Sequence, residues 1–114
     1  MDDQLDIRVV TERDCPVISI KGDIDLSCSP RVREAIFEAV PTAPLTIVDM
    51  AGVNAIDSSG IASLLEGYQL ARKRGARFVL ADCGDAVMRV LSLAKLDVVF
   101  DLVASVEQAL EGRE

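Results

Sequence analysis

Two adjacent serines that follow an aspartate form the stretch of this sequence best suited to chemistry. Asp57, Ser58 and Ser59 precede Gly60, and apolar residues then recur at helical spacing from Ile61 onward. Asp57 or Ser58 can therefore be the N-cap, whose side-chain oxygen accepts a hydrogen bond from an amide of the first turn. Because the amides and dipole of a helix N-terminus favour negative charge, a serine here is well placed to carry a phosphate.

A second group of acidic residues follows an earlier strand. Asp23 and Asp25 lie two residues apart in the stretch 22–25, so their side chains can point to one side of the chain. Carboxylates in this position are equally typical of a solvated turn. On local physics alone, Asp-Ser-Ser-Gly is likewise an ordinary turn and N-cap. A functional interpretation of either stretch depends on the elements around it.

The remaining residues argue against most enzyme classes. The chain has no histidine, so Ser-His-Asp and Cys-His arrangements are impossible and a zinc site is not expected. It has no Gly-x-Gly-x-x-Gly sequence and no P-loop, which disfavours a nucleotide site. Its cysteines, Cys15, Cys28 and Cys83, are widely spaced and are expected to be ordinary reduced thiols. We therefore expect no catalytic residue, no metal, no cofactor and no enzymatic activity.

Charge and hydropathy indicate the setting in which the protein works. The 114-residue chain is 50% hydrophobic with a formal net charge of −7, which suits a single domain with a substantial core. An acidic surface disfavours nucleic acid and anionic membranes as partners. The apolar runs are too short to span a membrane, and the acidic start is unlike a secretory signal. We expect a cytoplasmic monomer or weak dimer whose partner presents basic groups.

Hydrophobic periodicity divides the chain into alternating strands and helices. The expected strands are residues 5–9, 17–21, 45–50, 77–81 and 98–100. The expected helices begin at Ser29 as N-cap, at Asp57 or Ser58, after residues 82–85 and at Ser105. Residues 12–16 are expected to form a turn. A single domain over residues 1–114, with flexible ends at about 1–3 and 111–114, follows from this pattern.

The order of these elements predicts an α/β fold. The first two strands form a hairpin, and helices separate the later strands, which are therefore expected to be parallel. The expected architecture is a small mixed β-sheet of roughly four to five strands, with the helices packed on one face.

The motifs, taken in order along nearly the whole chain, resemble the STAS domain family, in particular its anti-sigma factor antagonists. The stretch 22–25 is similar to the family's Gly-Glu-Leu-Asp, with Asp23 in place of the commoner glutamate. Residues 47–53 followed by 56–61 match the most distinctive stretch of the family, except that Ala55 replaces a bulkier apolar residue. Residues 74–80 and 90–97 fit as well, with the spacing intact.

The resemblance implies a STAS fold and a partner-switching role. Such an antagonist binds an anti-sigma factor, usually a GHKL-type serine kinase, and so frees a sigma factor. The kinase phosphorylates the first serine of Asp-Ser-Ser-Gly, which releases the antagonist, and a PP2C-like phosphatase removes the phosphate. Carried over, Ser58 is the phosphoacceptor and Ser59 the secondary candidate. The implied partner-binding residues are Asp23, Asp25, Asp57, Ser58, Ser59 and Gly60.

Three other functions remain open at this point. STAS subunits of ABC-type lipid transport complexes share the fold but often carry a different residue at the serine position, so Ser58 favours the switch. A response-regulator receiver would use Asp49 as its phosphoacceptor, but its acidic pair would follow the first strand of a regularly alternating fold. A scaffold in a larger signalling assembly would use the same surface without switching.

Overall fold

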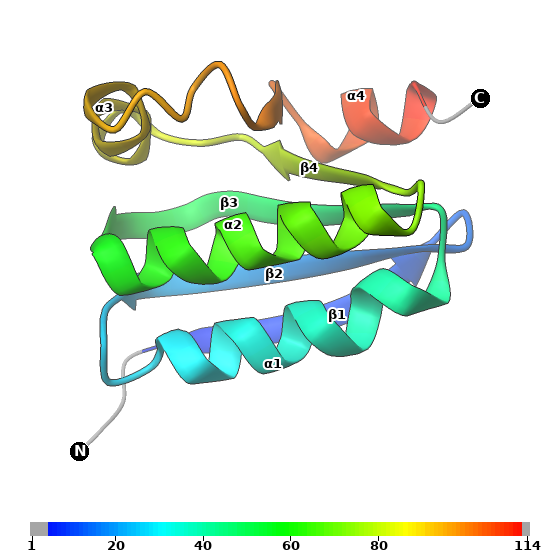
Figure 1. Cartoon of the computed structure of the whole chain (residues 1–114), viewed down its shortest axis with the longest axis horizontal. Helices are drawn as coiled ribbons and strands as arrows, with labels where there is room; N and C mark the ends of the chain where they lie inside the picture. The colour runs from blue at the N-terminus through cyan, green and yellow to red at the C-terminus, as the bar shows by residue number, and fades with distance from the viewer. Residues whose placement is uncertain (1–4, 113–114) are drawn as a thin grey trace.

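A computed structural model describes residues 5–112 as a mixed five-stranded sheet with helices packed on it (Figure 1). The strands are β1 (Asp6–Glu12), β2 (Cys15–Ile24), β3 (Leu45–Ile56), β4 (Arg77–Ala81) and β5 (Asp101–Val103). The helices are α1 (Ser29–Ala39), the short 3₁₀ helix η1 (Val40–Thr42), α2 (Ser58–Lys73), α3 (Asp85–Leu93) and α4 (Val106–Glu111). The strands lie in chain order, with β1 antiparallel to β2 and the others parallel. The predicted α/β fold with a mixed sheet is confirmed.

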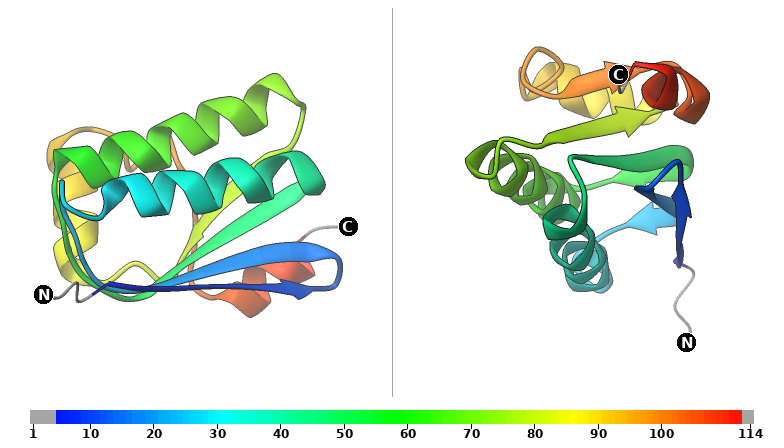
Figure 2. Two further views of the ribbon diagram at one scale, coloured as in Figure 1. Left: turned by 90° about the horizontal axis from the view of Figure 1, so that it is seen from below. Right: turned by 90° about the vertical axis from the view of Figure 1, so that its right-hand side faces the viewer.

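Helices cover both faces of the sheet, which corrects the expectation that they pack on one. Helices α1, α2 and α3 belong to the larger core cluster, through residues such as Val32, Leu64 and Leu91. Helix α4 lies across the sheet from α1 and α2 (Figure 2, left) and packs Ala109 and Leu110 in a second cluster with β3 and β4. The apolar runs of β3 and β4 are buried without alternation, so both faces of these strands need a cover.

The opening hairpin has a tighter turn than the predicted 12–16. Arg13 and Asp14 have φ values of 51° and 65°, as the two central residues of a type I′ turn require. Cys15 and Pro16 therefore already belong to β2, where they pair with the end of β1. Pro16 was expected to end the turn, but it lies at the start of β2, where its missing N–H is tolerated.

Two predicted element starts are wrong. The N-cap of α1 is Cys28 rather than Ser29. The Asp25 carbonyl accepts hydrogen bonds from the amides of both residues, so the chain begins to turn one residue earlier than predicted.

The last strand is β5 and not residues 98–100. Val98 is 83% exposed, whereas Phe100 is buried in the core. Residues 98–100 therefore form an apolar turn that one buried side chain anchors, and this turn has the same composition as a short strand.

The other elements agree with the sequence patterns more closely. Strand β4 has its predicted bounds, and Gly75 adopts a φ of 70° after α2. Ser105 caps α4 by accepting a hydrogen bond from the amide of Gln108. Glu111, which was expected to fray, is the last residue of α4. Gly112 forms a turn after α4, and the remaining residues of the predicted flexible ends, 1–3 and 113–114, lie outside the described residues.

Strand β3 continues to Ile56, well past its predicted end at Met50. The register between β2 and β3 shifts twice, around Ser19/Lys21 and Gly22/Asp23. These irregularities interrupt the apolar alternation, so the second half of β3 did not have the pattern of a strand. The longer β3 brings the start of α2 level with the end of β2.

We expect Leu64→Ala to lower the free energy of unfolding by about 2–5 kcal/mol, because the Leu64 side chain is fully buried between α2 and the sheet. Leu93→Ala is the matched control, since Leu93 is 80% exposed and its loss should change stability by no more than about 0.5 kcal/mol. Denaturant unfolding of both variants tests the assignment. Equal losses would mean that the packing of α2 has been misjudged.

Candidate functional site

The start of α2 is seated directly on the ends of β2 and β3. A Cβ atom on Gly60 would lie 2.6 Å from Ile56 Cγ1 and 2.7 Å from Ile24 Cγ2, so only a glycine permits this approach. The Asp57 amide donates a hydrogen bond of 3.1 Å to the Ile24 carbonyl and joins the two strand ends. Gly60 is buried; it therefore shapes the loop and does not present a contact surface.

Asp57 is the N-cap of α2 and uses the amides of the first turn. Its Oδ1 atom accepts from the Ser59 amide at 2.9 Å, the Gly60 amide at 3.2 Å and the Ser59 hydroxyl at 2.6 Å. The Ser59 hydroxyl is the largest cause that lowers the pKa of Asp57 below its ordinary value, so this carboxylate is charged at neutral pH. Asp57 is thus one of the two predicted N-caps, and in the unphosphorylated chain it occupies the Ser59 and Gly60 amides.

The two serines differ sharply in their surroundings. The Ser59 hydroxyl is bound to Asp57, and the residue is only partly exposed. Ser58 is exposed, and its hydroxyl has no hydrogen bond to any residue in the part of the chain that the structure describes. The Ser58 hydroxyl is therefore the one that an incoming reagent can reach without breaking the cap.

The turn between β2 and α1 repeats the same arrangement. Asp25 Oδ1 accepts from the Ser27 hydroxyl at 2.6 Å and from the Ser27 amide at 3.0 Å. The Ser27 hydroxyl is the largest cause that lowers the pKa of Asp25. Asp25 and Ser27 thus correspond to Asp57 and Ser59, and Leu26 takes the place that Ser58 has in the other turn. Asp25, which the sequence marked as a partner contact, also holds its own turn together.

The two turns lie close enough to influence each other. The Leu26 amide helps to lower the pKa of Asp57, and the negative charge of Asp57 acts in the opposite direction on the pKa of Asp25. Asp25, Leu26, Asp57 and Ser58 therefore form one exposed surface, called here the double-turn surface. Among the described residues, neither of its carboxylates has a salt bridge to a lysine or arginine.

Sequence reasoning missed Leu26, whose side chain is 75% exposed. The available signal was a large apolar residue within the polar loop between Asp25 and Ser27. An exposed leucine beside two charged carboxylates can supply the apolar contact area that a protein–protein interface needs at its centre.

Two other aspartates contribute less directly. Asp23 is exposed in β2 beside Ala55 of β3, and its carboxylate has no hydrogen bond or ion pair with the described residues. Asp49 lies within β3, where its side chain accepts from the Ala51 amide and the Ser19 hydroxyl at 3.1 and 3.3 Å. These hydrogen bonds hold Asp49 locally within β3.

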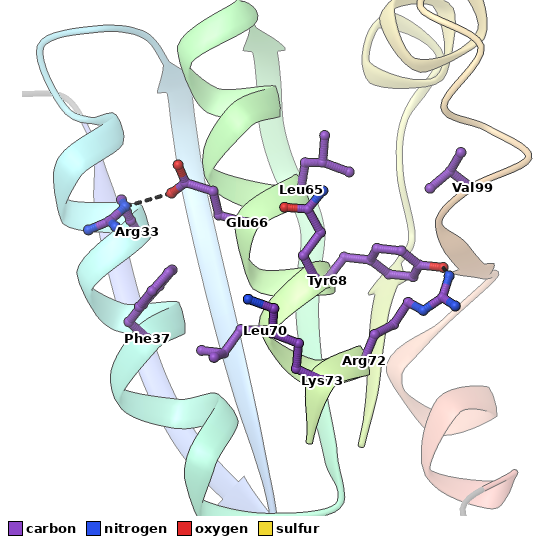
Figure 3. Close-up of a pocket in the computed structure, with 10 residues that line it drawn as sticks. Arg33, Phe37, Leu65, Glu66, Tyr68, Leu70, Arg72, Lys73 and Val99 are labelled. Carbon is purple, nitrogen blue, oxygen red and sulfur yellow. Dashed lines mark hydrogen bonds and ion pairs between the residues drawn. The ribbon is translucent and has the colours of Figure 1, made fainter. Parts of the chain in front are cut away.

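A shallow hollow of about 670 Å³ lies along α2, away from the double-turn surface (Figure 3). It has apolar lining from Phe37, Leu65 and Tyr68, and an Arg33–Glu66 ion pair of 2.6 Å crosses its rim. None of the predicted site residues lines it. The candidate site is therefore an exposed protein surface and not a concave ligand pocket.

The chain belongs to the STAS domain family. The family model described as "Mlab, STAS domain" matches residues 7–104, which include both turns of the candidate site. The chain is 29% identical over 111 residues to the anti-sigma-F factor antagonist RsfB of Mycobacterium tuberculosis, a match that covers 96% of this chain and 90% of that protein.

Two solved structures show the same fold. The chain is 27% identical to an anti-sigma factor antagonist from Mycobacterium paratuberculosis, with a TM-score of 0.85 over 95% of this chain and 92% of that one. The phosphorylated form of the Bacillus cell fate determinant SpoIIAA is 19% identical, with a TM-score of 0.73 over 93% and 97% of the two chains.

No helix within residues 5–112 is long and apolar enough to cross a membrane.

We expect Ser59→Ala to raise the pKa of Asp57 toward its ordinary value, because the Ser59 hydroxyl is the largest cause of the lowering. Ser58→Ala is the control and should leave this pKa unchanged. Carbon-detected NMR titration of the aspartate carboxyl groups measures both variants. A shift of equal size in both would show that the two hydroxyls share the Asp57 carboxylate.

The same pKa shift makes the stability of the protein depend on pH. The pKa of Asp57 is lower in the folded chain, so its contribution is present at neutral pH and is lost as the pH falls below about 4. We expect the loss of stability on acidification to be smaller in Ser59→Ala than in the wild type, as measured by thermal melts across this range.

Proposed function

We propose that this protein is an anti-sigma factor antagonist whose binding is switched off by phosphorylation of Ser58. The observation that carries the proposal is the difference between the two serines: the Ser59 hydroxyl is bound to Asp57, while the exposed Ser58 hydroxyl is unengaged within the described residues. The names of the M. tuberculosis and M. paratuberculosis proteins support the antagonist role.

In the proposed cycle, the unphosphorylated protein binds an anti-sigma factor that is itself a GHKL-type serine kinase. The Ser58 oxygen forms a bond to the γ-phosphorus of ATP held by the kinase, the bond to the departing ADP breaks, and a base of the kinase takes the hydroxyl proton. A PP2C-like phosphatase later hydrolyses the phosphoserine. The antagonist supplies the acceptor and the recognition surface, and its partners supply the chemistry.

The switch works through charge at a surface that is already negative. A phosphate on Ser58 adds about 1.5 to 2 negative charges beside the Asp57 carboxylate. Asp57 occupies the Ser59 and Gly60 amides, so the phosphate remains exposed unless it displaces the cap. A partner that packs on Leu26 and on the two carboxylates would have to desolvate this dianion, which opposes binding strongly.

The same fold would also serve an STAS subunit of an ABC-type lipid transport complex. That function does not need a free hydroxyl at position 58. Affinity capture from the native cell separates the two functions. A kinase among the captured proteins supports the switch, and a permease with its ATPase supports the transport subunit.

We expect Ser58 to be the main phosphoacceptor. In a native-cell extract supplied with ATP, the wild type and Ser59→Ala should both become phosphorylated, while Ser58→Ala should not, because only the Ser58 hydroxyl is accessible without loss of the cap. Phosphopeptide mass spectrometry locates the phosphate. Modification mainly at Ser59, or full modification of Ser58→Ala, contradicts the assignment.

We expect Asp25→Asn and Leu26→Ala each to weaken capture of the anti-sigma partner by about tenfold or more, as hot-spot residues do. Asp25→Asn is preferable to Asp25→Ala, since the amide oxygen can still accept the bonds from Ser27 and the turn is kept. Val98→Ala, at an exposed position outside the double-turn surface, is the control. Normal binding by both turn variants, with normal thermal melts, would mean that the partner docks elsewhere.

A further inference from the structure

The outer edge of β1 is an open strand edge. No element within residues 5–112 pairs with β1 except β2 (Figure 2). The strand has seven residues, and all but Ile7 are exposed. Val9 and Val10 point to opposite faces of the sheet and are 51% and 49% exposed. The β1–β2 register runs without a bulge, and β1 contains no proline. Natural proteins usually interrupt such edges, because an exposed, regular, apolar edge pairs with another strand.

The hairpin determines which backbone groups of β1 are available. A two-residue turn is closed by a hydrogen-bonded pair, here Glu12 with Cys15. Hydrogen-bonded pairs alternate along an antiparallel ladder, so Ile7, Val9 and Thr11 direct their N–H and C=O groups to the outer edge. A strand that joins this edge can therefore form backbone hydrogen bonds only with these three residues.

We propose that β1 pairs antiparallel with β1 of a second copy of this chain, about a two-fold axis at Val10. In this register Val10 faces Val10 of the second copy, and Val9 is hydrogen-bonded to Thr11 of the second copy. Arg8 then faces Glu12 of the second copy, and the symmetry repeats this pair. Arg8, Val10 and Glu12 lie on one face of the strand, so an apolar contact is flanked by two pairs of opposite charge.

The charge pattern distinguishes this register from its neighbours. An axis at Val9 would place Asp6 opposite Glu12 twice, and an axis at Arg8 would place two arginines face to face, both of which are unfavourable. An axis at Ile7 would pair Asp6 with Arg8 but would join only residues 6–8 of β1 to residues 6–8 of the second copy. The axis at Val10 joins residues 8–12, leaves only Asp6 and Ile7 without a partner in β1, and combines an apolar centre with opposite charges and the outward-facing backbone groups of Val9 and Thr11.

The pairing leaves the double-turn surface free. That surface lies at the carboxyl ends of β2 and β3, whereas the new contact runs along the opposite side of β1 from β2. Two seven-residue strands bury less area than a standard stable interface, so the dimer is expected to be weak and concentration-dependent. It joins two five-stranded sheets into one continuous sheet.

Disulfide cross-linking tests the register directly. In the proposed pairing the Cα atoms of Val10 in the two copies are about 4.5 Å apart, so Val10→Cys should form a covalent dimer under mild oxidation. Val9→Cys is the matched control of equal exposure, and its Cα atoms are too far apart to cross-link efficiently. Efficient cross-linking of Val9→Cys alone, or of neither variant, overturns the proposal.

Charge reversal gives an independent test by sedimentation equilibrium. Arg8→Glu and Glu12→Arg should each weaken self-association about tenfold or more, because each turns two attractive pairs into two repulsive ones. The double variant should associate like the wild type, and a mixture of the two single variants should form a mixed dimer. A wild-type protein that stays monomeric at millimolar concentration, or a double variant that is not restored, overturns the proposal.

Thermal melts of the three charge variants check that the fold is kept, which is expected because Arg8 and Glu12 are exposed. If the wild type is monomeric and the edge instead captures an extended segment of another protein, the second-copy proposal fails. The proposed phosphorylation of Ser58 is unaffected by that result, because neither the cross-linking nor the sedimentation experiment involves the double-turn surface.

Discussion

The close contact of Gly60 with Ile24 and Ile56 is the constraint on which the candidate site depends. Because position 60 has no side chain, the first turn of α2 rests on the last residues of two parallel strands. The hydrogen bond from the Asp57 amide to the Ile24 carbonyl then fixes the turn after β2 against the cap of α2. Any larger residue at position 60 would lift the helix and separate the two halves of the double-turn surface.

The surface that results has a fixed shape and a fixed charge. The carboxylate of each aspartate accepts a hydrogen bond from the hydroxyl of the serine two residues later. These bonds hold both turns in shape and lower the pKa of both aspartates, so both carboxylates remain ionised. The residue between them is left exposed in each case, as Leu26 in one turn and Ser58 in the other. In the proposed switch, a phosphate on Ser58 would therefore change the charge of the same surface that offers Leu26 to a partner.

Local patterns in the sequence were sufficient for the fold class, for β4, for the Ser105 cap and for the left-handed Gly75 that follows α2, and they narrowed the cap of α2 to Asp57 or Ser58. Local patterns gave wrong bounds or positions where contacts between residues distant in the sequence determine the structure. The bulges of β3 interrupt its apolar alternation, so its second half was not predicted. The turn before the buried Phe100 contains two valines and was mistaken for a strand. The sequence of α4 does not reveal which face of the sheet it covers. The resemblance ranked Ser58 before Ser59, but only the structure supplies a physical difference between them, the hydrogen bond from the Ser59 hydroxyl to Asp57. The pairing of the two turns could not be seen from a single stretch of sequence.

The engagement of Ser59 by Asp57 has a consequence for specificity that concerns the unfolded chain. In a short peptide that spans residues 54–62, no folded turn would hold the Ser59 hydroxyl on Asp57, so the difference in accessibility between the two serines would be lost. The two serines differ in accessibility only in the native domain, where the Ser59 hydroxyl is hydrogen-bonded to Asp57 and the Ser58 hydroxyl is not. A modifying enzyme that depends on this difference must recognise the domain as a shape, and a nascent or denatured chain would escape it.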